Sequence, residues 1–189
     1  MKKILLTIAC VAVFSGAMAQ NFEWGVKAGL NLANMSNVDD SKMKPSFNVG
    51  VFGEYRFNDF IGIQPEIMFS RQGWYEKEGG DKAWAKFEYI NVPILAKIYL
   101  IDALSLEVGP QFGFLIDSKF KHKANGVTTK GDIVGTKDFD ISVGMGLSYQ
   151  ITYNLSVNAR YNLGLTKVND QGNDKMKNNV IQVGLGWKF

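Results

Sequence analysis

In eight separate stretches of this chain, apolar side chains occupy every second position. The last stretch shows the pattern clearly, because small or polar residues alternate with Ile181, Val183, Leu185, Trp187 and Phe189. Successive side chains of a β-strand point to opposite faces, so each stretch predicts a strand with one apolar and one polar face. The predicted strands are 22–33, 46–57, 60–72, 87–100, 104–116, 138–150, 155–166 and 179–189.

The connections between these strands alternate in length. Short connections predicted to be tight turns are 58–59, 101–103 and 151–154, and long polar loops are predicted at 34–45, 73–86, 117–137 and 167–178. Short periplasmic turns and long extracellular loops are typical of outer-membrane barrels, whose single chains have an even number of strands. Strands of about ten residues, tilted by about 40°, reach roughly 26 Å, close to the apolar band of that membrane. The chain is therefore predicted to be an all-β protein, an eight-stranded antiparallel up-and-down transmembrane β-barrel.

A soluble barrel such as a lipocalin-like carrier would also alternate, with its apolar face inside instead of outside. Alternation alone does not decide between the two. The membrane barrel is favoured by the asymmetric connections, the bulky apolar face, the charge-rich opposite face and the terminal aromatic residue. Aromatic residues also gather near strand ends, as interfacial girdles do: Phe22, Trp24, Tyr55, Phe57, Phe60, Trp74, Tyr75, Trp84, Tyr149, Tyr153 and Trp187.

The C-terminal strand carries a pattern of its own. Gln182, Gly184, Trp187 and Phe189 follow the order polar–x–Gly–x–x–aromatic–x–aromatic. This order resembles the C-terminal signal by which bacterial outer-membrane barrels are recognised for insertion. We therefore expect these four residues to be an assembly signal, and the barrel-assembly machinery to be a partner during insertion.

The N-terminal residues predict a secretory signal peptide. Lys2 and Lys3 precede the apolar run 4–14, and Ala17-Met18-Ala19 is a small-x-small cleavage site before Gln20. The run is too short for a transmembrane helix, which needs about 20 residues. A lipoprotein signal at Cys10 is a weaker alternative, because it would leave almost no apolar run. We expect residues 1–19 to be removed and 20–189 to form one barrel domain in the outer membrane.

The composition of the mature chain excludes several classes of function. Loss of Lys2 and Lys3 leaves 19 basic residues against 18 acidic ones. Such a nearly neutral chain gives no sign of nucleic-acid binding. The only cysteine leaves with the signal peptide, so disulfides and thiol chemistry are not expected.

Charged residues dominate the predicted inner face. Eight strands enclose a space just wide enough for side chains to fill, and charges there must pair and hydrogen-bond. We expect a salt-bridged network that fixes the shape of the barrel, with a narrow polar pathway for ions as the weaker alternative. The predicted network is Glu54, Arg56, Glu66, Lys97, Glu107, Asp140 and Arg160, and the same face also carries Glu23, Lys27 and Lys188.

Three prolines fall inside predicted strands, where they remove a ladder donor and predict bulges or local breaks. They belong to the segments Gln64-Pro65-Glu66, Tyr89 to Leu95 (containing Pro93) and Gly109 to Gly113 (containing Pro110). In that order the segments resemble those of the PorT-like outer-membrane β-barrel family of Bacteroidota. The resemblance covers essentially the whole mature chain and implies an eight-stranded outer-membrane barrel. It implies no single function, since some members support protein secretion and most are described only as barrels.

The sequence predicts no catalytic residue, metal site or cofactor. A lipid A-modifying enzyme would need a histidine with a serine and a carboxylate, and the one histidine, His122, has no serine at a recognisable spacing. The same segment is basic, which an ordinary solvated loop explains. Alternatively, Lys119, Lys121 and Lys123 are candidate contacts for lipopolysaccharide phosphates at the cell surface. We expect a non-enzymatic envelope protein with outer-membrane lipids as partners and a structural, interaction or secretion-supporting role.

Overall fold

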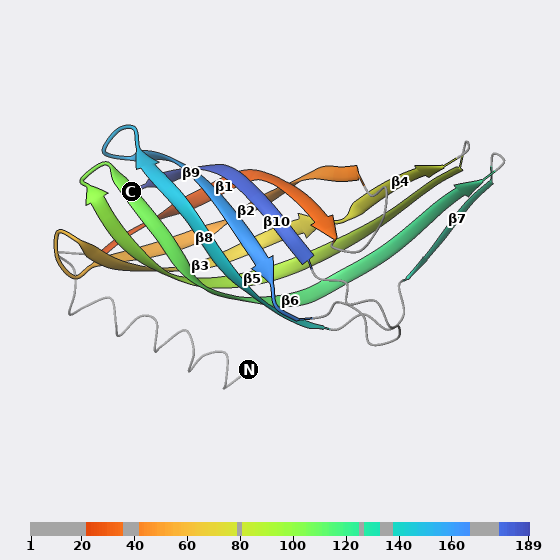
Figure 1. Ribbon diagram of the computed structural model, residues 1–189, viewed down its shortest axis with the longest axis horizontal. Coiled ribbons are helices and arrows are strands. Elements are labelled where there is room, and N and C mark those ends of the chain that lie inside the picture. The colour runs from red at the N-terminus through yellow and green to blue at the C-terminus, as the bar shows by residue number, and fades with distance from the viewer. Residues whose placement is uncertain (1–21, 36–41, 79–80, 125–126, 133–137, 167–177) are drawn as a thin grey trace.

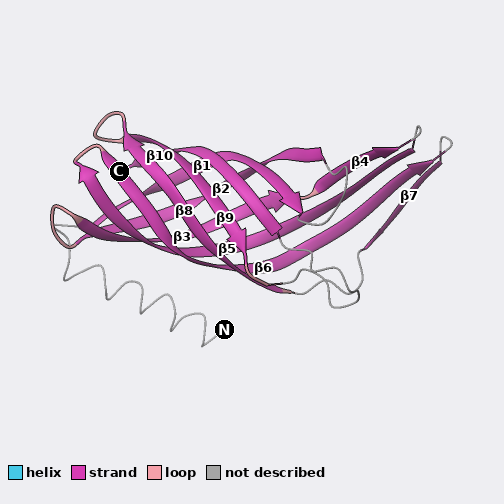
Figure 2. Cartoon of the chain, viewed as in Figure 1, coloured by secondary structure: helices cyan, strands magenta, loops and turns pink. Residues whose placement is uncertain are grey.

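The computed structural model describes residues 22–35, 42–78, 81–124, 127–132, 138–166 and 178–189. These residues form strands joined by short turns (Figure 2). Within them no helix is long and apolar enough to cross a membrane. The strands are β1 (Phe22–Met35), β2 (Lys42–Arg56), β3 (Ile61–Gln72), β4 (Trp74–Glu78), β5 (Asp81–Ile101), β6 (Leu104–Ala124), β7 (Val127–Asp132), β8 (Phe139–Gln150), β9 (Leu155–Gly164) and β10 (Asn178–Lys188).

Eight of these strands close into an antiparallel barrel, which confirms the predicted fold. The ring runs β1–β2–β3–β5–β6–β8–β9–β10, and β10 returns to pair with β1. At the closing seam Val26 lies opposite Trp187, and the Phe189 amide donates to the Trp24 carbonyl oxygen at 3.0 Å. Closure leaves the ring without an unpaired edge, which is what the lipid core of a membrane requires.

Two predicted loops contain further strands. Residues 73–86 and 117–137 were expected to be long loops, but β4 pairs with the outer part of β5, and β7 pairs with the outer part of β6. The outer parts of β5 and β6 also pair with each other, so the four strands form a sheet that projects from the end of the barrel opposite the C-terminus (Figure 1). Its strands contain aromatic and β-branched residues that favour extended backbone, including Trp74, Tyr75, Trp84 and Val127.

The two faces of the barrel wall are apolar outside and polar inside. Large apolar side chains are exposed on the outer face, for example Leu30 (62%) and Ile67 (57%). The inner face buries charged and amide side chains, for example Glu107 (0%) and Asn31 (0%). A soluble lipocalin-like carrier needs the reverse arrangement, so that alternative was wrong.

The three prolines inside the strands interrupt three consecutive ladders without changing the register. Each interruption leaves out two paired positions, so the prolines mark local ladder breaks and not bulges. The β2–β3 ladder stops at Phe52↔Glu66 and resumes at Tyr55↔Ile63, around Pro65. The β3–β5 ladder stops at Pro65↔Ile94 and resumes at Met68↔Asn91, around Pro93, and the β5–β6 ladder stops at Pro93↔Gln111 and resumes at Ala96↔Val108, around Pro110.

Candidate functional site

Four charged side chains from four different strands meet in the middle of the lumen. Arg160 of β9 donates two hydrogen bonds to the Glu66 carboxylate of β3, both at 2.9 Å, and one to Glu107 of β6 at 2.7 Å. Lys27 of β1 lies 2.7 Å from Glu66 and 3.8 Å from Glu107. We call Lys27, Glu66, Glu107 and Arg160 the central cluster. Its two cations and two anions balance, which is the condition under which buried charges are tolerated.

Glycines on the inner face make room for the central cluster. Gly146 lies opposite Arg160 in the β8–β9 ladder, and a Cβ at this position would lie 2.9 Å from the Arg160 Cα atom. A Cβ on Gly144 would lie 3.3 Å from Arg160 Cδ, and one on Gly186 would lie 3.5 Å from Lys27 Cγ. Side chains at these positions would occupy the space that the long cations need to reach across the lumen.

A layer of amide and hydroxyl groups covers the central cluster on the side of the projecting sheet. The Asn31 amide donates to the Ser70 hydroxyl at 2.9 Å and to the Arg71 carbonyl oxygen at 2.9 Å. Its oxygen accepts from Asn48 and, at 3.1 Å, from Gln182. These amide and hydroxyl groups come from the neighbouring strands β10, β1, β2 and β3, so they form a bonded layer along one wall of the lumen, next to the central cluster that spans it.

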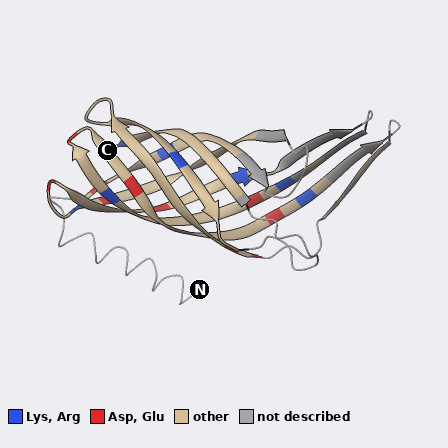
Figure 3. Cartoon of the chain, in the orientation of Figure 1, with Lys and Arg blue, Asp and Glu red and all other residues tan. Residues whose placement is uncertain are grey.

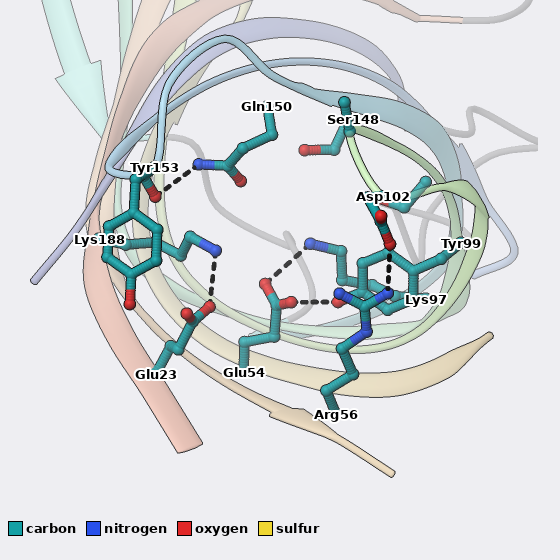
Figure 4. A pocket seen from close by; sticks show the side chains of 12 residues that line it. Glu23, Glu54, Arg56, Lys97, Tyr99, Asp102, Ser148, Gln150, Tyr153 and Lys188 are labelled. Carbon is teal, nitrogen blue, oxygen red and sulfur yellow. Dashed lines mark hydrogen bonds and ion pairs between the residues drawn. The ribbon is translucent and has the colours of Figure 1, made fainter. Parts of the chain in front are cut away.

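On the other side of the central cluster, at the end of the short turns, the lumen widens into a cavity of about 300 Å³. Figure 4 shows its charged side chains in pairs: Lys97 with Glu54 at 2.8 Å, Lys188 with Glu23 at 2.6 Å and Arg56 with Asp102 at 3.4 Å. The Tyr99 hydroxyl also donates to Glu54, and the Arg56 guanidinium lies 4.0 Å from the centre of the Tyr99 ring. The cavity thus offers both signs of charge, already neutralised in pairs.

The residues predicted for the lumen network separate into three places. Glu66, Glu107 and Arg160 lie in the central cluster, whereas Glu54, Arg56 and Lys97 line the end cavity. Asp140 lies nearer the projecting sheet and accepts a hydrogen bond from the Thr166 hydroxyl. The predicted network did not include Lys27, although the alternation of apolar and polar residues had placed Lys27 on the inner face. The sequence analysis also did not identify the amide layer. The one sign of it in the sequence is that its residues occupy the alternate positions that face the lumen.

A second group of charges lies on the outside, where β5 and β6 leave the barrel. Glu88 lies 2.7 Å from both Arg71 and Lys86, and Asp117 lies 3.0 Å from Lys119 and 3.7 Å from Lys86. Figure 3 shows residues of both signs at the base of these extended strands. Of the candidate lipopolysaccharide contacts, Lys119 therefore belongs to this rim group. The side chains of Lys121, Lys123 and His122 lie outside the described residues.

The predicted assembly residues lie on both faces of β10. Gln182 points inward and bonds to the amide layer, whereas Trp187 and Phe189 are exposed on the outer face. The Phe189 ring packs against Trp24 of β1, with 4.6 Å between the ring centres. No group of histidine, cysteine or carboxylate side chains that could hold a metal ion occurs among the described residues.

Comparison with solved structures shows the same fold in outer-membrane proteins. The attachment invasion locus protein Ail of Yersinia pestis superposes with a TM-score of 0.57 and 18% identity, over 90% of this chain and 100% of that one. Neisserial surface protein A (NspA) superposes with a TM-score of 0.53 and 17% identity, over 89% of this chain and 97% of that one. CarO of Acinetobacter baumannii superposes with a TM-score of 0.50 and 13% identity, over 87% of this chain and 98% of that one. At these identities the likeness concerns the fold.

Sequence comparison gives the family. No curated protein matches the chain. Residues 18–170 match the sequence model described as "Outer membrane protein beta-barrel domain", which is more than half of the chain. The family agrees with the apolar outer wall and polar lumen of the structure, and it places the protein in the outer membrane. The chain belongs to the outer membrane protein β-barrel domain family.

Proposed function

We propose that the protein is a non-enzymatic envelope protein whose sealed barrel anchors the projecting β4–β7 sheet at the cell surface. The observation that carries this proposal is the central cluster, where Arg160 of β9 reaches Glu66 of β3 on the opposite side of the ring and also bonds to Glu107 of β6. A barrel filled in this way serves as a rigid support. The sheet lies at the end of the long connections, which is the extracellular end in outer-membrane barrels.

The structural, interaction or secretion-supporting role and the likeness to the PorT-like family are parts of the same proposal. Deletion of the gene, followed by comparison of the surface and secreted proteins by mass spectrometry, tests it. Loss of particular cargo or surface proteins, restored by the full chain but not by a variant lacking residues 74–86, supports a role of the sheet. Unchanged profiles together with an unchanged envelope would count against it.

A narrow polar pore is the second candidate, and the cavity of about 300 Å³ at the end of the short turns is the observation in its favour. Planar-bilayer recording separates the two functions. We expect no stable conductance from the wild-type protein, because the central cluster and the amide layer lie between this cavity and the other end. A steady single-channel current would favour the pore.

A lipid A-modifying enzyme is the least supported candidate. A change in lipid A mass that depends on the protein and is abolished by His122→Gln would establish it. The signal peptide 1–19 remains a proposal as well, tested by N-terminal sequencing of the protein from outer membranes. A mature chain that starts at Gln20 is the expected result.

A further inference from the structure

The ladders of the projecting sheet place its lysines on one face. Residues directly opposite each other in an antiparallel ladder lie on the same face of the sheet. The paired positions Lys86↔Lys119, Trp84↔Lys121 and Lys82↔Lys123 follow one another along β5 and β6 in a constant register. Extension of this face to β4 and β7 gives the lysine face: Lys77, Lys82, Lys86, Lys119, Lys121, Lys123 and Lys130, with Glu88, Asp117 and Asp132 as its carboxylates.

The charges on the lysine face are balanced only near the barrel. At its base, Glu88 and Asp117 pair with Lys86, Lys119 and Arg71 at 2.7–3.7 Å. Farther out, the register sets lysine opposite lysine, at Lys77↔Lys82, Lys82↔Lys123 and Lys121↔Lys130. Like charges directly opposite each other destabilise a ladder, and an anion bound between them removes the repulsion.

The other face of the sheet does not share this charge. The residues there include Glu76 opposite Ala83, and Glu78 opposite Asp81. His122 also lies on that face, opposite Ala83 and Thr129. The excess of positive charge is therefore a property of one face and not of the whole sheet.

The lysine face continues the lipid-facing wall of the barrel. Just below it, Phe114 and Ile116 are exposed on β6, and the exposed Phe47 ring lies 5.1 Å from the Arg71 guanidinium. The register shifts by one residue between Glu88 and Tyr89, which brings Asp117 to the outer side opposite Glu88. Charged residues therefore begin where the apolar band ends, first as balanced pairs at the base of the sheet and then, farther from the barrel, as an excess of lysines.

We propose that the lysine face binds phosphate groups carried by the lipids of the outer leaflet. Lysine ammonium groups bind phosphate as point charges and need no fixed approach angle, which suits a layer of lipid headgroups. The inference deepens the proposed function, because it rests on the sheet lying at the outer surface. It extends the candidate contacts Lys119, Lys121 and Lys123 to lysines of β4, β5 and β7 that the sequence did not group with them.

The test uses the full mature chain in nanodiscs of phosphatidylcholine with a small fraction of bisphosphorylated lipid A. Native mass spectrometry compares the lipid A retained by the wild type with that retained by the triple variant Lys82→Gln, Lys121→Gln and Lys123→Gln. Each lysine near an anionic surface changes binding about fivefold, so we expect the triple variant to lose roughly a hundredfold in preference. The matched control carries arginine at the same three positions and should retain the wild-type preference.

Two further arms identify the source of the phosphate. Lipid A without its phosphates should be retained equally by the wild type and the glutamine variant. Soluble hexametaphosphate should compete only weakly with bisphosphorylated lipid A in the membrane. Equal retention by the wild type and the glutamine variant would overturn the proposal, and so would tight binding of hexametaphosphate in pure phosphatidylcholine. Conductance of the same protein after transfer to planar bilayers tests the sealed barrel separately. Failure of the proposed function is therefore distinguishable from failure of phosphate binding by the lysine face.

Discussion

Replacement of Arg160 by methionine is the most direct test of the sealed lumen. The guanidinium is buried, with 4% of the side chain exposed, and it supplies three of the hydrogen bonds that the Glu66 and Glu107 carboxylates accept. Without it, Lys27 is the one cation of the cluster left for the two buried carboxylates, at 2.7 and 3.8 Å, and the Gln64 amide still donates to Glu66 at 2.6 Å. Removal of one partner from a buried ion pair typically costs about 3–5 kcal/mol, because the other partner is left charged without compensation.

Urea unfolding in lipid vesicles measures this cost, with the folded fraction read from unheated SDS gels. For a urea dependence of roughly 2 kcal/mol per molar, the Arg160→Met variant should unfold at a midpoint lower by about 2 M. Arg56→Met is the matched control, since its partner Asp102 is fully exposed at the mouth of the end cavity. An exposed pair of this kind contributes at most about 1 kcal/mol, and the contact of Arg56 with the Tyr99 ring adds about 0.5–1 kcal/mol, so the control should lose clearly less stability than Arg160→Met.

A double-mutant cycle with Glu66→Gln completes the test. Because the two side chains share two hydrogen bonds, the double variant should be more stable than the sum of the single effects predicts, by about 1–3 kcal/mol. Wild-type stability of Arg160→Met, or strict additivity in the cycle, would refute the reasoning that the central cluster holds the barrel together.

Three smaller perturbations test other parts of the structure. Phe189→Ser removes the ring contact with Trp24, so we expect less heat-modifiable protein in isolated outer membranes, and normal levels would contradict a role of this seam in assembly. Gly146→Ala forces a Cβ to 2.9 Å from the neighbouring strand's Cα and should cost about 1–3 kcal/mol of unfolding free energy in the same urea assay. Tyr99→Phe removes the hydroxyl that donates to Glu54 and should cost about 1–2 kcal/mol; an unchanged urea midpoint would show that this bond contributes nothing.

The strands of the barrel were predictable because a bilayer imposes the same local rule on each of them. Each barrel strand must present apolar side chains to lipid and polar ones to the lumen. The odd or even position of a residue along its strand, as for Ile67 and Glu66, is therefore enough to predict which face it occupies. The projecting sheet follows no such rule. Outside the membrane a polar stretch serves equally well as loop or strand, and pairing with the extensions of β5 and β6 turned residues 74–78 and 127–132 into strands.

The sequence by itself determined the eight-stranded barrel, the polar lumen and the set of charges inside it. Only the tertiary structure decided which charges meet. Glu66 and Arg160 are 94 residues apart and lie on strands that are not neighbours in the ring, so their contact depends on the stagger of the closed barrel. The lysine face has the same origin, because the one-residue register shift beside Glu88 decides which side of the sheet the charges of β6 occupy. Parity along a strand is local, whereas register between strands is set by closure of the whole ring.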